Sequence, residues 1–363
     1  MSVKKILRKS IRLTAVLLVV MAAALNAASC GSSGSESKNP QGKKTIVSAS
    51  CGTGTAFFLE SSDTLWAAGL NKNGQLGIGS NGNQSTPVKV TDGVSAVSAG
   101  GQHTLILKTD KTLWAAGGNS LGQLGNGETA DSNVPVKVMD DVVSFSAGYS
   151  YSAAVTGDGT LWAWGYNASG QMGLPDKTVL TPQKITDNCK TVIASDYAIL
   201  AIKTDGTLWY SLEKDKAIAS GVTGIQAGRE HFVYTTSDGK LYTFGQGGFG
   251  QLGNGSADGS DAPVEIDSDV KAIAAGYSHT LYVKEDGTLW ATGRNDMGQL
   301  GDGTTENKQK PVKIADGVKA VFAGENSSVI IKTDGTVQAF GGNEEKQLTF
   351  EEPVVSVLKE ISF

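Results

Sequence analysis

The chain has 363 residues, of which 47 are glycine and 18% are charged, and its net charge at pH 7 is −5. This acidic balance lacks the basic footprint with which proteins collect phosphate backbones, so it argues against nucleic acid as a partner. The glycines recur in phase along most of the chain, which assigns them to turns and argues against a disordered protein.

The N-terminus has the pattern of a secretory leader. Five basic side chains precede an apolar run over residues 13–25, which is too short for a comfortable membrane span. Small residues then precede Cys30, and this arrangement resembles the bacterial lipoprotein signal, in which the cysteine is acylated and becomes the new N-terminus. We therefore expect a signal peptide over residues 1–29 and a lipid on Cys30. The alternative is plain secretory cleavage nearby, with Cys30 a bystander.

Residues 30–45 follow as the lipidated cysteine and a tether, because residues 31–44 are rich in serine and glycine and lack apolar periodicity. Such an anchor would hold the protein in the cell envelope, on the outer side of the cytoplasmic membrane or in the outer membrane. Loss of residues 1–29 removes five basic side chains and no acidic ones, so the net charge would change from −5 to −10.

From Ile46 to the C-terminus one pattern recurs, and a Leu-Trp pair or its variant marks each copy. The pairs begin at Leu65, Leu113, Leu161, Leu208, Leu241, Leu289 and Val337, in steps of 48, 48, 47, 33, 48 and 48 residues. Self-similarity at such a period indicates supersecondary units that are stacked or arranged in a ring.

Each unit reads as four strands, because its apolar stretches are short, rich in β-branched and aromatic residues, and separated by glycine-rich turns. In the second unit we predict strand A at 95–100, strand B at 103–108, strand C at 112–117 and strand D at 135–138. Proline at the start of strand D is tolerated at a strand start or a sheet edge, so D is predicted to be the outer strand.

The turn between strands B and C is Asp-Gly in five of the seven units, and this dipeptide predicts a two-residue hairpin loop. The first two units have Ser62-Asp63 and Asp110-Lys111 there instead. These two units are expected to form the turn less favourably or to use another turn type.

A single sheet of this kind cannot bury both of its faces. Seven sheets in a ring can, which predicts an all-β, seven-bladed β-propeller of four-stranded antiparallel blades over residues 46–363. An open solenoid would need polar capping repeats, and none is visible. Residues 353–357 match strand D, and residues 359–363 resemble the start of another strand A, so the C-terminal strand is expected to close the ring.

Four motifs of the second unit carry a resemblance to a known family: Ala-Gly-x-x-His-Thr from Ala99, Leu-Trp-Ala-x-Gly from Leu113, Gly-Gln-Leu-Gly from Gly122 and Pro-Val-Lys-Val from Pro135. They resemble the regulator of chromosome condensation repeat, whose family implies a seven-bladed propeller. The resemblance covers residues 46–357. The fourth unit lacks Gly-Gln-Leu-Gly, and the seventh keeps only Gln-Leu.

The resemblance also implies functions. The founding relative is a guanine nucleotide exchange factor for a nuclear GTPase, and a secreted bacterial relative is a β-lactamase inhibitor. The leader, and the lack of a wedge-like insertion in the repeats, argue against exchange. We therefore expect an exported, monomeric, non-enzymatic propeller that binds a protein or glycan. Inhibition of an extracytoplasmic enzyme is the first alternative, and guanine nucleotide exchange is the second.

No catalytic residue, cofactor or metal site is predicted. The three histidines share one repeat position, ten residues before the Leu of the following pair, which packing explains better than catalysis: His103, His231 and His279. The acidic clusters 258–261 and 267–269 lack the ligand spacing of a calcium loop and read as solvated turns. Cys51 and Cys189 fall in distant blades and are predicted to be buried and unpaired.

In an up-and-down sheet the A–B turns and the C–D loops emerge on one side of the blade. Only this side is diverse in sequence, and it contains tyrosine and arginine, the residue types that anchor protein interfaces. For any single residue, ordinary exposed loop chemistry is the alternative. The predicted partner-binding face comprises Tyr149, Tyr166, Arg229, Glu230, Phe249, Tyr277 and Arg294.

The fourth unit is shortened on this same side. The interval from Leu208 to Val222 is 15 residues shorter than the interval from Leu113 to Val142, so the Gly-Gln-Leu-Gly loop is lost while residues 216–219 can still supply strand D. We predict a notch in the rim of the face, which either admits a loop of a partner or marks an eroded repeat.

The leader generates the first testable prediction. Mass spectrometry of the mature protein should find an acylated N-terminal peptide that begins at Cys30, and a Cys30→Ser variant should lose that modification. An unmodified mature N-terminus at another residue would reject the anchor while leaving export intact.

Overall fold

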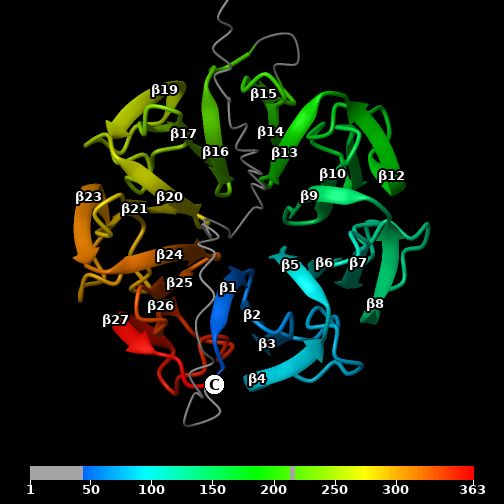
Figure 1. Cartoon of the computed structure of the whole chain (residues 1–363), viewed down its shortest axis with the longest axis horizontal. Coiled ribbons are helices and arrows are strands. Elements are labelled where there is room, and N and C mark those ends of the chain that lie inside the picture. Colours follow the sequence, from blue (N-terminus) through cyan, green and yellow to red (C-terminus); the bar gives the residue numbers. More distant parts are fainter. Residues whose placement is uncertain (1–43, 213–216) are drawn as a thin grey trace, which may run out of the picture.

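A computed structural model describes residues 44–212 and 217–363. In that part the chain forms 27 strands, arranged as seven sheets around a central axis (Figure 1). No helix within the described ranges is long and apolar enough to cross a membrane. The predicted signal peptide, Cys30 and the tether up to residue 43 lie outside the described residues.

The seven sheets are the seven predicted blades, taken in chain order. Blade one has β1 (Ile46–Cys51), β2 (Thr55–Glu60), β3 (Leu65–Gly69) and β4 (Gln84–Thr91), and blade two has β5 (Val94–Ala99), β6 (His103–Lys108), β7 (Leu113–Gly117) and β8 (Ser132–Met139). Blade three has β9 (Val142–Ala147), β10 (Tyr151–Thr156), β11 (Leu161–Tyr166) and β12 (Thr178–Thr186), and blade four has β13 (Cys189–Ala194), β14 (Ile199–Lys203) and β15 (Leu208–Tyr210). Blade five has β16 (Val222–Ala227), β17 (His231–Thr236), β18 (Leu241–Gly245) and β19 (Ser260–Asp267), and blade six has β20 (Val270–Ala275), β21 (His279–Lys284), β22 (Leu289–Gly293) and β23 (Lys308–Ala315). Blade seven has β24 (Val318–Ala323), β25 (Ser327–Lys332), β26 (Val337–Gly342) and β27 (Val354–Glu360).

The strand predictions for the second unit are confirmed for A, B and C to within one residue. The outer strand β8 is longer than predicted and begins three residues before Pro135. Its register against β7 shifts between Ala115 and Gly117, so the proline lies in a bulged part of an edge strand. A bulge at an edge tolerates the missing N–H, which is why proline does not have to open the strand.

The hairpin between strands B and C is confirmed, but the two-residue loop is wrong. In blade three the Thr156 N–H donates to Thr160 O at 3.0 Å and the Gly159 N–H donates to Thr156 O at 2.8 Å, which leaves three residues in the loop. Of the three loop residues, only Gly159 has a positive φ, which is 84°. Asp158 instead accepts hydrogen bonds from the Thr156 hydroxyl and the Thr160 N–H, at 2.7 and 3.0 Å.

The first two blades form this same turn without glycine. Asp63 and Lys111 take its place with φ angles of 61° and 66°. Their N–H groups donate to Glu60 O and Lys108 O at 3.0 Å, as the glycine does elsewhere. The turn type is therefore kept, at the cost of a left-handed conformation on an L-residue with a Cβ.

The apolar core lies between the blades. One cluster joins blades seven and one through Phe322, Val329 and Phe58, and another joins blades one and two through Phe57 and Ile106. Each sheet therefore buries its faces against its two neighbours, as a ring requires.

Ring closure differs in detail from the prediction. Residues 359 and 360 belong to β27, the outer strand of blade seven, and blade one supplies all four of its own strands. The tail closes the ring by side-chain packing: the Phe363 ring lies 5.0 Å from that of Phe58, edge to face, and Ile361 joins the same cluster. The prediction of an additional strand A is wrong, because blade one already has its own strand A in β1 and residues 361–363 form no strand.

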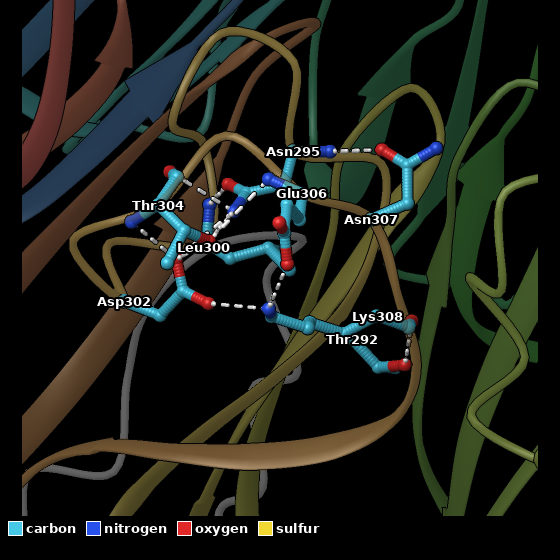
Figure 2. Close-up of polar contacts among 8 residues, drawn as sticks. All are labelled: Thr292, Asn295, Leu300, Asp302, Thr304, Glu306, Asn307 and Lys308. Carbon is cyan, nitrogen blue, oxygen red and sulfur yellow. Dashed lines mark hydrogen bonds and ion pairs between the residues drawn. The ribbon is translucent and has the colours of Figure 1, made fainter.

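The Gly-Gln-Leu-Gly motif lies in the C–D loop, which blade six shows in close-up (Figure 2). The Asn295 side chain accepts the Leu300 N–H at 2.9 Å and donates to Asp302 Oδ1 at 3.0 Å and to Thr304 O at 3.2 Å. Lys308 Nζ, at the start of β23, lies 3.4 Å from Asp302 Oδ2 and so connects the end of the loop to its middle (Figure 2). The asparagine bond to the apolar residue recurs at Asn71, Asn119, Asn167, Asn295 and Asn343.

These loops insert one apolar side chain per blade into the protein. Each of these side chains is fully buried: Leu76, Leu124, Met172, Leu252, Leu300 and Leu348. Leu124 belongs to the cluster that includes Trp164 of blade three. The loop therefore bridges its own blade and the next.

Blade four departs as the sequence indicates. Its sheet has three strands, and its fourth is reduced to a bridge in which the Leu208 N–H donates to Ala219 O at 2.9 Å and the Ile218 N–H donates to Leu208 O at 3.0 Å. The predicted strand D at 216–219 is thus shortened to a single pairing, and residue 216 lies outside the described ranges.

If the loop leucines connect the blades, Leu124→Ala should lower the free energy of unfolding by about 2–5 kcal/mol, because it removes a fully buried side chain from a packed cluster. Val134, which is 49% exposed on β8, provides the matched control, and Val134→Ala should change stability by less than about 0.5 kcal/mol. Denaturant unfolding of both variants checks this. Equal effects would contradict a bridging role.

Candidate binding face

The mouth of the central channel is ringed by one residue from each blade. Each is the second residue after strand A, placed there because strand A is the innermost strand of its blade (Figure 1). The seven are Thr53, Gly101, Tyr149, Asp196, Arg229, Tyr277 and Glu325, and together they line a cavity of about 140 Å³. Blades one and two contribute small residues, whereas blades three to seven contribute aromatic or charged ones, so the mouth is strongly asymmetric.

The histidines lie directly behind this ring and connect adjacent blades. His103 Nε2 lies 2.8 Å from Ser152 Oγ in the next blade, and that hydroxyl donates to Gln123 O at 2.9 Å. Because the single hydroxyl proton goes to the carbonyl, the histidine donates from Nε2. His231 and His279 make the same contact, each at 3.0 Å, with Thr280 and Ser328.

Burial lowers the pKa of His103 and His279 to about 3 and that of His231 to about 4. The three rings are therefore uncharged at neutral pH. In these three blades strand A is followed by a glycine, because the histidine ring packs on the backbone there: a Cβ at Gly100 would lie 2.8 Å from His103 Cε1. The histidines thus hold the inner turns in place, in agreement with the structural interpretation.

Arg229 is the centre of the charged side of the mouth. Its Nη2 donates to the Tyr197 hydroxyl at 3.2 Å, and its Nε lies 3.6 Å from Asp196 Oδ2 and 3.8 Å from Glu230 Oε1. The guanidinium carbon also lies 4.9 Å from the centre of the Tyr277 ring, within the range of a cation–π contact.

Acidic groups outnumber this single cation. Burial raises the pKa of the Asp196 carboxyl to about 6, and Glu230 and Glu325 add like-charge repulsion while Arg229 opposes the shift. The mouth therefore changes its charge close to neutral pH. A basic or hydrogen-bond-donating group of a partner would relieve this repulsion.

Five of the seven predicted face residues meet around one pocket between blades five and six. Arg229, Glu230, Phe249, Tyr277 and Arg294 line a cavity of about 280 Å³. The Arg294 guanidinium carbon lies 5.6 Å from the centre of the Phe249 ring, and Phe249 is 43% exposed. The sequence prediction thus identified residues that the fold brings together.

The two remaining predicted residues lie elsewhere. Tyr149, which is 44% exposed, lines the channel mouth on the blade-three side. Tyr166 ends β11 and pairs with Thr178 of the outer strand, away from the residues that line the mouth. Neither position contradicts a role in binding.

Sequence reasoning missed Asp196 and Tyr197 as site residues and did not select Glu325. Asp196 and Tyr197 occupy the A–B turn of blade four, where alanine at 198 stands in place of the histidine that marks the turn in blades two, five and six. Alignment of strands A and B, instead of the histidine motif, would have found them. The sequence does identify Glu325 as a residue of the A–B turn in blade seven.

Other candidate chemistry is not supported by the described residues. Within 44–212 and 217–363 no group of three His, Cys, Asp or Glu side chains is arranged to hold a metal ion. Asp267 of the second acidic cluster instead accepts hydrogen bonds from Lys284 and Tyr282, at 2.6 and 2.8 Å. Cys51 and Cys189 are buried and free, as predicted.

Comparison with family profiles gives a clear match. The profile of the Regulator of chromosome condensation (RCC1) repeat matches residues 62–107, 110–155, 158–197, 238–283 and 286–331, more than half of the chain. A second RCC1 repeat profile matches residues 94–123, 142–171, 222–251 and 270–299. The first profile leaves out 198–237, where blade four loses its loop. Among curated proteins, none is significantly similar to the chain in sequence.

Solved structures share the fold at low identity. Prp20p from Saccharomyces cerevisiae, described with its binding to Gsp1p and histones, is 21% identical, with a TM-score of 0.74 over 85% of this chain and 88% of that chain. Human WBSCR16 is 24% identical, with a TM-score of 0.69 over 80% of this chain and 87% of that chain. The ectodomain of the Physcomitrella patens receptor kinase CR4 is 14% identical, with a TM-score of 0.54 over 81% of this chain and 72% of that chain.

The raised pKa of Asp196 gives a prediction with a defined sign. The folded state holds this proton to a higher pH than the unfolded state, so ionisation destabilises the fold as the pH rises from about 4 through about 6. The thermal midpoint of Asp196→Asn relative to wild type should therefore increase over that range and stay constant above it.

Asp205→Asn is the control for this titration. Its carboxylate is bound by the Thr207 N–H and hydroxyl, which lower the pKa of Asp205. The midpoint difference for this variant should be flat above about pH 5, because both states are ionised there. Parallel pH curves for Asp196→Asn and wild type would show that the carboxyl at 196 is not perturbed.

Proposed function

The chain belongs to the Regulator of chromosome condensation (RCC1) repeat family, and from this premise we propose that it is an exported, lipid-anchored, non-enzymatic propeller that binds a protein partner through the channel-mouth face. Anchoring rests on the leader and Cys30. Binding rests on the face itself. Fold similarity to Prp20p lends support, because that protein is described as binding Gsp1p and histones.

The observation that carries the proposal is that tyrosine, phenylalanine and arginine side chains from several blades lie together on one surface. Tyr149, Arg229 and Tyr277 ring the channel mouth, and Phe249 and Arg294 extend the same surface between blades five and six. Tyrosine and arginine are the residues that most often dominate binding energy at protein interfaces. The mouth also carries acidic groups at Asp196 and Glu325, which favours a partner with basic or hydrogen-bond-donating side chains.

The proposal assigns no catalytic role to any residue. The histidines are kept neutral by burial, and each forms a hydrogen bond to a hydroxyl group of the next blade. We therefore assign them a role in stabilising the ring. Inhibition of an extracytoplasmic enzyme would be one form of the same binding, with the face occupying the active site of the partner.

Capture from envelope extracts tests the proposal. The full chain, solubilised with mild detergent and immobilised through a C-terminal tag, should retain a protein, and Tyr149→Ala, Arg229→Ala and Tyr277→Ala should each weaken that binding about tenfold or more. Lys89→Ala, at a half-exposed site on the outer strand β4, is the control and should leave binding unchanged.

The readouts separate the alternatives. Capture that is unaffected by the three face variants rejects the choice of face. Capture that is lost after glycosidase treatment of the extract indicates a glycan instead of a protein. If the captured protein is an enzyme, its turnover with and without the propeller distinguishes inhibition from binding alone.

A further inference from the structure

The contact between blades four and five differs from the other contacts in the ring. The C–D loop of each of the six other blades inserts a fully buried leucine or methionine, and all of these except Leu252 belong to apolar clusters that include residues of the next blade. The sequence of blade four is too short for such a loop, and the described residues around this position line a groove of about 790 Å³. A volume of this size is typical of ligand-binding clefts in proteins.

The contacts between other neighbouring blades show what normally lies at the place of this groove. In blade two, the loop glycine at 125 lies so close to Trp164 of blade three that a Cβ would come within 2.6 Å of the indole, and Gly301 lies as close to Phe340 of blade seven, at 2.8 Å. At these two boundaries the glycine that follows the loop leucine thus packs on an aromatic residue of strand C, whereas Gly77 and Gly253 face Ala116 and Thr292 at the same position.

The same aromatic position is present in blade five, and among the residues that the structure describes no loop of blade four lies above it. Phe244 pairs with Phe232 in the register in which Trp164 pairs with Ser152. The Ser152 hydroxyl binds the carbonyl of the loop glutamine in blade two. In blade five this hydroxyl is replaced by an aromatic ring, so the site has lost its polar contact to a loop and gained apolar surface.

The walls of the groove carry further apolar side chains from blade four. Tyr210 lies edge to face against Phe232 and Phe244, with ring centres 5.5 and 6.4 Å apart. Leu212 is 51% exposed. Leu212 lies four residues after the first residue of strand C. The six other blades have glycine at this position, namely Gly69, Gly117, Gly165, Gly245, Gly293 and Gly341. Phe232 and Phe244 are themselves nearly buried and form the floor, so the accessible apolar surface is the wall.

The groove is continuous with the channel-mouth face. Tyr197, Arg229 and Glu230 line the groove, and Arg229 also belongs to the mouth. A partner seated on the face would therefore have the groove within reach of an adjoining loop.

We propose that the groove between blades four and five receives a loop of the bound protein, and that this loop presents an aliphatic side chain at a glycine-flanked turn, in place of the Gly-Gln-Leu-Gly loop that blade four lacks. The inference rests on the proposed function, since it says which part of a partner enters the propeller. The occupant is specified by the loops of the other blades, and above all by the loops of blades two and six, whose glycines lie on an aromatic residue of the next blade.

A peptide probe tests this without the natural partner. A cyclised, fluorescently labelled peptide with the sequence of residues 118–127, the blade-two loop, should bind the full chain saturably in an anisotropy titration. Replacing the leucine that corresponds to Leu124 by alanine in the peptide should weaken binding about tenfold or more, because the buried side chain supplies most of the apolar contact.

A pair of protein variants locates the binding. Leu212→Glu should weaken binding of the leucine peptide about tenfold or more, whereas Val357→Glu, at a residue 49% exposed on β27, should leave it unchanged. Both positions are exposed, and equal thermal midpoints for the two variants would show that folding is preserved.

Three outcomes would overturn the inference: no saturable binding, equal binding of the leucine and alanine peptides, or binding that Leu212→Glu does not alter. A dimer in light scattering that Leu212→Glu dissociates would also overturn it, since a second copy would then fill the groove. These outcomes are separate from capture by the channel-mouth face, which the variants at Tyr149 and Tyr277 report.

Discussion

The packing of one blade against the next is the interaction on which the whole molecule depends, because no single four-stranded sheet can bury both of its faces. The apolar clusters run across blade boundaries, and the loop leucines and the histidine–hydroxyl contacts cross the same boundaries. Stability is thus shared among boundaries, and each boundary is built from residues at fixed positions of the repeat.

This arrangement leaves the inner turns free to vary. The residues before and after each turn are committed to the boundary, as Gly100 and His103 show, but the turn residue itself faces the channel mouth. The mouth therefore carries residues as different as Gly101, Arg229 and Glu325 on an almost constant scaffold. A binding surface can change in such a fold with little effect on its core.

Blade four is where the repeat is least regular and where the surface is most unusual. Loss of its loop removes a buried leucine from one boundary, and aromatic side chains at Tyr210, Phe232 and Phe244 fill part of the space. Local departures from an otherwise consistent pattern concentrate at functional or strained sites. The groove, the charged cluster around Arg229 and the pocket beside Phe249 all lie on this side of the ring.

The sequence by itself determined the number of blades, the order and approximate ends of strands A to C, the burial of both cysteines and five residues of one pocket, because these follow from a period and from strand alternation, which are local properties. It did not determine the three-residue hairpin loops, the bulge at Pro135 or the way the tail closes on Phe58, because these depend on hydrogen bonds and contacts between strands. Only the tertiary structure placed Asp196 and Tyr197 beside Arg229 and set the floor of the groove, since residues more than 30 positions apart meet there through the curvature of the ring.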